Sequence, residues 1–229
     1  MKIGIIGAGM IGGTLARRLA QLGHDVSIAN SRGPETLAAL AAEVGARAVE
    51  PKEAARSGEI VIVTIPERAV KDLPKDLFAG VPDDVVVVDT GNYYPARDGS
   101  IPAIEQGQPE SAWVAAQIGR PVIKAFNNIF FKSLLDKGLP NGSADRVAIP
   151  VAGDVAEAKS KVMQLIESLG FDAVDAGSLD ESWRQQPGSP CYTGDFTAPE
   201  LARALASAER DRVPEYRKAA DDAARAYWS

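Results

Sequence analysis

Three glycines near the start of the chain have a spacing suited to holding a dinucleotide. Gly7, Gly9 and Gly12 form a G-x-G-x-x-G pattern between an apolar run at 2–6 and a helical pattern that opens at Gly13. Such a turn leaves a strand sharply, lets the backbone approach a pyrophosphate and packs a helix close to the sheet. The free N–H groups at the start of that helix favour phosphate. The predicted pyrophosphate contacts are Gly9, Met10, Ile11 and Gly12, and Gly7, which makes the tight turn, is also predicted to lie at the cofactor.

The residues after the second predicted strand indicate which dinucleotide binds. NAD-binding units usually carry Asp or Glu at this place, where the carboxylate holds the ribose 2′-hydroxyl. Here the chain reads Asn30-Ser31-Arg32, with no carboxylate to repel a 2′-phosphate. Asn30 and Ser31 can donate hydrogen bonds, and Arg32 can form a charge-assisted pair with phosphate. The sequence therefore predicts NADP(H) rather than NAD(H), unless Arg32 is only a solvated loop residue.

Three further segments follow strands and should lie at the same edge of the sheet. Ligands of doubly wound sheets bind beyond the carboxyl ends of the strands. The segments are 64–66, 89–95 and 124–128, and the last two would approach the nicotinamide. The cofactor contacts predicted from them are Thr64, Ile65, Pro66, Gly91, Asn92, Ala125 and Asn127. The residues predicted to place the nicotinamide ring are Asn92, Phe126 and Asn127, with Asn128 as another hydrogen-bonding candidate and Tyr93 or Tyr94 as alternative walls.

A general acid or base is harder to find. The single histidine, His24, falls between the first helix and the second strand, at the wrong end of the sheet for chemistry. Cys191 has no histidine nearby in sequence, and one His with one Cys makes no usual zinc site. Lys124 and Asp89 are ionisable, but each is as well explained by an ion pair or a structural hydrogen bond. Hydride transfer between two bound rings needs no acid–base residue from the protein, since the protein supplies alignment and excludes water.

Composition limits the classes of protein that the chain can belong to. It has 229 residues, of which 45% are hydrophobic, so a sizeable core can form. The formal net charge of −6 argues against non-specific nucleic-acid binding. No apolar run is long enough to span a membrane, and a strand begins directly after Met1, where a signal peptide would lie. With a single cysteine, these features predict a soluble cytoplasmic protein that uses small-molecule substrates.

Strands and helices alternate along most of the chain. The first helix should span 10–22, another should run from Pro34 to near Gly45, a third should follow Pro66, and a fourth should span 111–118. Continuous apolar runs suit parallel strands that are covered on both faces. The strands are predicted at 2–6, 26–29, 46–49, 59–64, 84–89 and 121–124. The expected fold class is α/β, a Rossmann-type doubly wound parallel sheet with a small C-terminal extension.

The C-terminal part continues with fewer strands and more helices. Strands are expected at 146–151 and 171–174, and capping boxes should open helices at Asp154 and Thr197. The segment 182–195 should be a loop, and the tail from Val213 should be a packed helix. The predicted division is 1–145 for the nucleotide-binding domain and 146–229 for an extension that closes the substrate cleft.

Taken together, these motifs resemble one enzyme family. The residues at 7–12, 30–32, 92–95 and 124–128 resemble the NADP-dependent oxidoreductases of the coenzyme F420-dependent type, and the resemblance covers about 1–176. It implies a Rossmann-type domain with a small C-terminal part, usually in a homodimer. It also implies direct hydride exchange between NADPH and a deazaflavin in a cleft between the parts. The cytoplasmic domain of membrane ferric reductases is similar as well.

The leading hypothesis is therefore hydride transfer between NADP(H) and a flat, flavin-like acceptor, with coenzyme F420 or a flavin as second substrate. One alternative is a reductase of imines or small carbonyl compounds. An enzyme of the β-hydroxyacid dehydrogenase type would need a catalytic lysine on a helix after the nucleotide domain. Lys132 and Lys137 lie on a helical stretch there, but neither is in a GxxxK setting. Another alternative is a non-enzymatic NADP(H) sensor.

Overall fold

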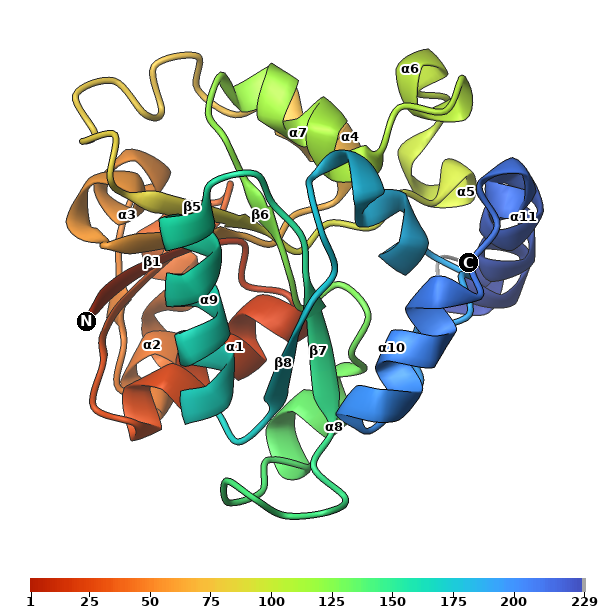
Figure 1. Cartoon of the computed structure of the whole chain (residues 1–229). Coiled ribbons are helices and arrows are strands. Elements are labelled where there is room, and N and C mark those ends of the chain that lie inside the picture. The colour runs from red at the N-terminus through yellow and green to blue at the C-terminus, as the bar shows by residue number, and fades with distance from the viewer. Residues whose placement is uncertain (228–229) are drawn as a thin grey trace.

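Six parallel strands form the central sheet of the computed structural model, which describes residues 1–227 (Figure 1). The strand order is β3-β2-β1-β4-β5-β6, so the direction of strand progression reverses beside β1. Each neighbouring pair is parallel. The bounds are β1 Lys2–Ile6, β2 Asp25–Ala29, β3 Arg47–Ala48, β4 Ile60–Val63, β5 Val86–Asp89 and β6 Ile123–Lys124. This topology confirms the predicted doubly wound, Rossmann-type fold.

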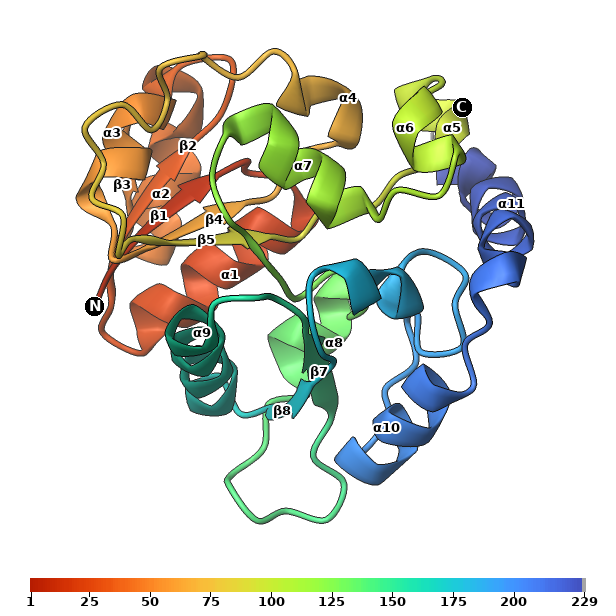
Figure 2. The same cartoon turned by 45° about the horizontal axis from the view of Figure 1, so that its top comes forward.

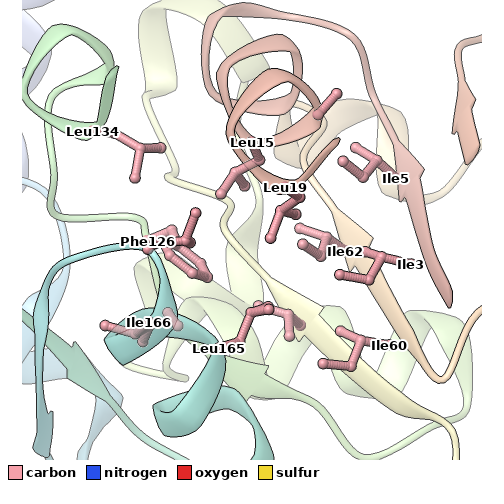
Figure 3. Packing of buried hydrophobic residues seen from close by; sticks show 14 of the residues in the cluster. Ile3, Ile5, Leu15, Leu19, Ile60, Ile62, Phe126, Leu134, Leu165 and Ile166 are labelled. Atoms are coloured by element: carbon pink, nitrogen blue, oxygen red, sulfur yellow. The ribbon is translucent and has the colours of Figure 1, made fainter. Parts of the chain in front are cut away.

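Helices cover both faces of the sheet, because successive strand residues point to opposite sides. Ile60 and Ile62 pack with helices α1, α2, α8 and α9, while Val61 packs with α3 and Val63 packs beside α7. Figure 3 shows Leu165 and Ile166 of α9 on the same side of the sheet as Ile60 and Ile62. The bounds are α1 Met10–Gln21, α2 Ala38–Val44, α3 Pro51–Ser57, α7 Glu110–Ile118, α8 Phe131–Asp136 and α9 Ala156–Ser168. Three shorter helices are α4 Glu67–Val70, α5 Pro95–Asp98 and α6 Pro102–Glu105.

The C-terminal part adds a second, two-stranded parallel sheet and two helices. Its elements are β7 Ala148–Val151, β8 Asp172–Asp175, α10 Ala198–Ala206 and α11 Val213–Ala224. An antiparallel bridge between Lys124 and Ala152 joins the end of β6 to the residue after β7. Ile149 also belongs to the large core cluster of the central sheet, so the two parts share a core. Both views place α11 beside α5 and α6 (Figures 1 and 2). The domain division at 145/146 stays a prediction.

Several local predictions need correction. The Asp154 capping box is wrong: α9 follows Val155, and Asp154 Oδ1 instead accepts the Leu179 N–H at 2.9 Å. The predicted loop at 182–195 begins inside a 3-10 helix, Asp180–Gln185. The helix expected from Pro34 starts as a 3-10 turn that ends at Leu37, before α2. The other capping box, at Thr197, is confirmed at the start of α10. Further 3-10 turns span Arg210–Arg212 and Arg225–Tyr227.

No helix within residues 1–227 combines the length and the apolar character needed to cross a bilayer.

Candidate nucleotide site and strand-end cluster

The glycine turn joins β1 to α1 and is shaped by close backbone contacts. Gly7 has φ +115°, a conformation that side chains disfavour, and a Cβ there would lie 2.1 Å from the Thr64 carbonyl oxygen. A Cβ on Gly12 would lie 2.0 Å from the Gly7 carbonyl oxygen. Two of the three glycines therefore let the turn, α1 and the end of β4 pack together.

Gly9 differs from the other two, because a Cβ at this position would meet no atom within 4 Å. Packing within the protein does not require a glycine here. Gly9 is also the N-cap of α1 and offers no side-chain cap to the first N–H groups of the helix. Those N–H groups and the open space above Gly9 suit a pyrophosphate. Met10, 63% exposed, and the half-buried Ile11 follow in the first turn.

The residues after β2 form a compact polar turn. Asn30 Oδ1 accepts the Arg32 backbone N–H at 2.9 Å, and Asn30 Nδ2 donates to Thr36 Oγ1 at 2.9 Å. Ser31 and Arg32 are exposed, and the structure of residues 1–227 gives Arg32 no ion-pair partner. The Glu35 carboxylate, which sequence reasoning overlooked, folds back toward Gly33, where a Cβ would lie 2.4 Å from Oε1. The turn thus presents one exposed guanidinium, at Arg32, and one carboxylate, at Glu35.

The predicted amides at the ends of β5 and β6 lie together. Asn92 Nδ2 donates to the Asn127 carbonyl oxygen at 2.9 Å, and Asn127 Nδ2 donates to Asn92 Oδ1 at 3.0 Å. Asn127 Nδ2 also donates to the Gln185 carbonyl oxygen, and its Oδ1 accepts from Gln185 Nε2. Asn127 is buried and both of its side-chain N–H groups donate to the protein, whereas the half-buried Asn92 donates only one of its two N–H groups. Asn92 is therefore the amide that can bind a ligand.

The other strand-end contacts predicted for the cofactor are placed as follows. Thr64, Ile65 and Pro66 follow β4 and are all half-buried, with the Thr64 N–H bonded to the Ile6 carbonyl oxygen at 2.8 Å. Gly91 and Ala125 are buried directly after β5 and β6. All of these residues lie at the carboxyl edge of the sheet, as Gly7 does.

The aromatic residues predicted as ring walls have structural roles instead. Phe126 adopts φ +62°, and its ring is fully buried in the core beside Leu134 and Ile166 (Figure 3). It therefore presents no side-chain surface to a bound ring, and only its backbone remains at the strand end. The fully buried Tyr93 bonds through its hydroxyl to Glu105 Oε1 at 2.7 Å. The Tyr94 hydroxyl, also buried, bonds to the Tyr192 hydroxyl.

A cluster of ionisable side chains, all buried except the half-buried Arg97, lies at the ends of β4, β5 and β6. We call it the rim cluster and define it as Glu67, Asp89, Arg97, Glu110 and Lys124. Lys124 Nζ lies 3.7 Å from Asp89 Oδ2 and 3.6 Å from Glu110 Oε2, and these three side chains are at most 2% exposed. Arg97 Nη2 lies 3.4 Å from Oε2 of the fully buried Glu67.

Burial changes the protonation of this cluster. It raises the pKa of Glu67 well above the ordinary value, and the nearby Asp89 and Glu110 carboxylates raise it further. Burial also raises the pKa of Glu110 to about 7, against the opposing charge of Lys124. For Lys124, burial acts to lower the pKa, yet the three carboxyl groups together hold it above its ordinary value. Burial and neighbouring carboxyl groups therefore raise the pKa of Glu67, and those carboxyl groups also raise the pKa of Lys124.

Sequence reasoning identified Lys124 and Asp89 as ionisable but missed Glu67 and Glu110. Each of these glutamates is the first residue of a short helix and follows a proline. An acidic residue in a helix's first turn has an ordinary explanation, the helix dipole. Only the pairing of β4, β5 and β6 brings the four side chains together, so local sequence carries no signal for the cluster.

The remaining candidates behave as structural residues. His24 Nδ1 lies 3.2 Å from the Met1 amino nitrogen, at the opposite edge of the sheet from the glycine turn. Cys191 is buried, and burial raises its pKa to about 11, so its thiol is a poor nucleophile. No group of His, Cys, Asp and Glu among residues 1–227 has the arrangement of a metal site.

Comparisons with known proteins agree with this architecture. Residues 2–93 match the family model described as NADP oxidoreductase coenzyme F420-dependent. Among solved structures, the hypothetical protein SMa0349 of Sinorhizobium meliloti is 31% identical, with a TM-score of 0.71 and coverage of 86% of this chain and 96% of that chain. An Arthrobacter sp. FB24 protein, provisionally named an F420-dependent NADP-reductase, is 25% identical with a TM-score of 0.64, covering 80% of this chain and 87% of that one.

A curated relative is similar over a comparable stretch. Metalloreductase STEAP3 of Rattus norvegicus is 29% identical over 181 residues, which are 78% of this chain. The chain spans only 34% of the rat protein's length. Together with the glycine turn of β1 and α1, these matches show that the chain belongs to the family described as NADP oxidoreductase coenzyme F420-dependent.

Proposed function

We propose that this chain is an NADPH-dependent oxidoreductase that passes a hydride between NADP(H) and a flat, flavin-like acceptor, with coenzyme F420 as the best candidate. The observation that carries the proposal is the open space at Gly9, since packing within the protein does not explain a glycine there. Gly9, Met10, Ile11 and Gly12 would hold the pyrophosphate, with the N–H groups of α1 as donors.

The cofactor's 2′-phosphate would bind at the turn after β2. Ser31 and Arg32 are exposed, and Asn30 holds the turn through its hydrogen bond to the Arg32 N–H. A phosphate would give Arg32 the ionic partner that it lacks in the structure of residues 1–227. Glu35 would oppose a second negative charge, so its replacement should not weaken NADPH binding.

The nicotinamide would lie over the ends of β4 and β5, where the Asn92 amide keeps unused hydrogen-bonding capacity. The reduced nicotinamide supplies the hydride when the cofactor is bound. The protein then needs to align two flat rings and exclude water. The family match and the provisional name of the Arthrobacter relative support F420 as acceptor, and the similarity to a metalloreductase makes ferric chelates the second choice to test.

Two experiments test the proposal. Isothermal titration should show tighter binding of NADPH than of NADH, and Arg32→Ala should remove about ten-fold or more of the NADPH affinity. Arg203→Ala, which changes another exposed arginine, on α10, is the matched control and should bind NADPH as the wild type does. Tighter NADH binding, or an unaffected Arg32→Ala variant, would contradict the choice of NADP(H).

The acceptor is tested by stopped-flow mixing of NADPH-loaded protein with F420, flavins and ferric chelates. Faster oxidation of NADPH by F420 than by flavins or ferric chelates would support F420 as the acceptor. Turnover only with imines or small carbonyl compounds would favour the alternative reductase, and tight NADPH binding without any turnover would favour a sensor. The proposal also includes a cytoplasmic homodimer, for which sedimentation equilibrium gives the test of subunit number.

A further inference from the structure

Charged side chains of the rim cluster form hydrogen bonds with three backbone polar groups of the turn that follows β5. The Gly91 N–H donates to Asp89 Oδ1 at 2.9 Å, and Lys124 Nζ donates to the Gly91 carbonyl oxygen at 2.7 Å. Arg97 Nη2 donates to the Asn92 carbonyl oxygen at 2.5 Å. Charge-assisted hydrogen bonds of this kind are shorter and stronger than neutral ones. The rim cluster therefore fixes the orientation of the peptide groups of this turn.

Lys124 is itself held on every side. Its backbone N–H donates to the Ala152 carbonyl oxygen at 2.8 Å, and its carbonyl oxygen accepts the Ala152 N–H at 3.0 Å. Its side chain is fully buried between Asp89 and Glu110. A buried ammonium with two carboxylate neighbours has little freedom to move. The Nζ atom is thus a rigid anchor for the Gly91 carbonyl group.

What the anchored turn presents outward is the Asn92 side chain. Its amide pairs with Asn127, and Asn127 pairs with Gln185 of the C-terminal part. The turn lies at the carboxyl end of β5, two strands from the glycine turn of β1 across β4. In this sheet topology a dinucleotide crosses the strand ends at the reversal of strand order, so its two halves lie on opposite sides of β1.

We propose that Lys124 is a positioning residue, which fixes the Gly91–Asn92 turn so that the Asn92 amide is presented to the nicotinamide ring of the bound cofactor. The inference rests on the proposed function. Lys124 has no exposed surface, so it acts through the turn and does not touch the ring. Removal of its Nζ should affect recognition of the nicotinamide while recognition of the pyrophosphate and the 2′-phosphate persists.

The test compares two ligands, NADPH and 2′-phospho-ADP-ribose, which is the same nucleotide without the nicotinamide ring. The measured quantity is the ratio of their dissociation constants from isothermal titration. In the wild type, NADPH should bind more tightly than the fragment. In Lys124→Met, the affinity for the fragment should persist, and the advantage of NADPH should fall by about ten-fold, as expected for a lost buried hydrogen bond.

Lys124→Met leaves buried carboxyl groups without their cation and can compromise folding. The double variant Lys124→Met/Glu110→Gln removes one of those carboxylates and should show the same loss of the NADPH advantage. Arg146→Met is the matched control, because Arg146 is a buried cation, 2% exposed, that lies just before β7 and pairs with Glu167 of α9 at 2.9 Å. It should lower stability but keep the wild-type ratio.

A folded Lys124→Met or double variant that keeps the wild-type ratio would overturn the role of Lys124 while the proposed function stands. A wild-type ratio of one would also overturn it, because the ring would then gain nothing from the turn. Failure of the wild type to bind either ligand would overturn both proposals.

Discussion

Two glycines of the turn between β1 and α1, Gly9 and Gly12, should respond differently to substitution by alanine. Gly9 has φ −75° and ψ −164°, which alanine also adopts, and its added Cβ meets no protein atom within 4 Å. Gly9→Ala should therefore change the free energy of unfolding by at most about 1 kcal/mol, the usual effect of a changed N-cap. The methyl group would instead occupy the space that we assign to the pyrophosphate. Overpacking of about 1–3 kcal/mol corresponds to NADPH binding weakened by about 5- to 150-fold.

At Gly12 the clash lies within the protein itself. The added Cβ would lie 2.0 Å from the Gly7 carbonyl oxygen and 2.7 Å from Thr64 Cγ2, so backbone atoms must move. Gly12→Ala should lower the free energy of unfolding by about 1–3 kcal/mol or more. Urea unfolding measures the stability of both variants, and isothermal titration with NADPH measures binding. Wild-type NADPH affinity in Gly9→Ala would refute the placement of the pyrophosphate, and wild-type stability in Gly12→Ala would refute the packing argument.

Three further predictions concern groups away from the turn. Because burial raises the pKa of Glu110 from an ordinary 4.5 to about 7, the folded protein binds more protons than the unfolded chain between these values. The free energy of unfolding should thus fall by up to about 3 kcal/mol as pH rises through this window, and Glu110→Gln should flatten the decline in urea titrations from pH 5 to 8. Leu165→Ala should cost about 2–5 kcal/mol in thermal or urea unfolding, because Leu165 is fully buried in the core, and a smaller loss would mean that the site collapses around the cavity. Cys191 should resist alkylation by iodoacetamide at pH 8 until urea unfolds the protein, as mass spectrometry would show; rapid modification of the folded chain would contradict its burial.

The central sheet was predictable because its signals are local and repeat. Each apolar run between helical patterns became a parallel strand, and only the ends moved, as where the segment predicted at 121–124 shortened to Ile123–Lys124. The capping error occurred where a side chain had a distant partner. Asp154 has the sequence pattern of a helix cap, yet its carboxylate accepts the Leu179 N–H, 25 positions away. A pattern of four residues carries no information about such a partner.

The same distinction applies to the candidate site. The glycine turn and the Asn30–Arg32 segment are each contiguous, so the sequence alone could suggest them as nucleotide contacts. Phe126 shows the limit: an aromatic residue at a strand end fits either a ring wall or the core, and its φ of +62° turns the side chain into the core. Backbone conformation at one position decided between the two interpretations, and residue type alone does not predict that conformation.

The rim cluster shows why an absence of acid–base residues in a sequence is weak ground for a mechanism. Its glutamates are 43 positions apart, Glu67 and Glu110, and each has an ordinary local role at a helix start. Tertiary structure gives them a second role, since their shared burial beside Lys124 raises the pKa of both carboxyl groups. Buried charges are costly unless they are paired, and clusters with perturbed pKa values concentrate at functional sites. In this protein the paired cations Lys124 and Arg97 also form hydrogen bonds with the Gly91–Asn92 turn at the strand ends. The cluster therefore most directly stabilises the part of the sheet edge that faces the proposed nicotinamide.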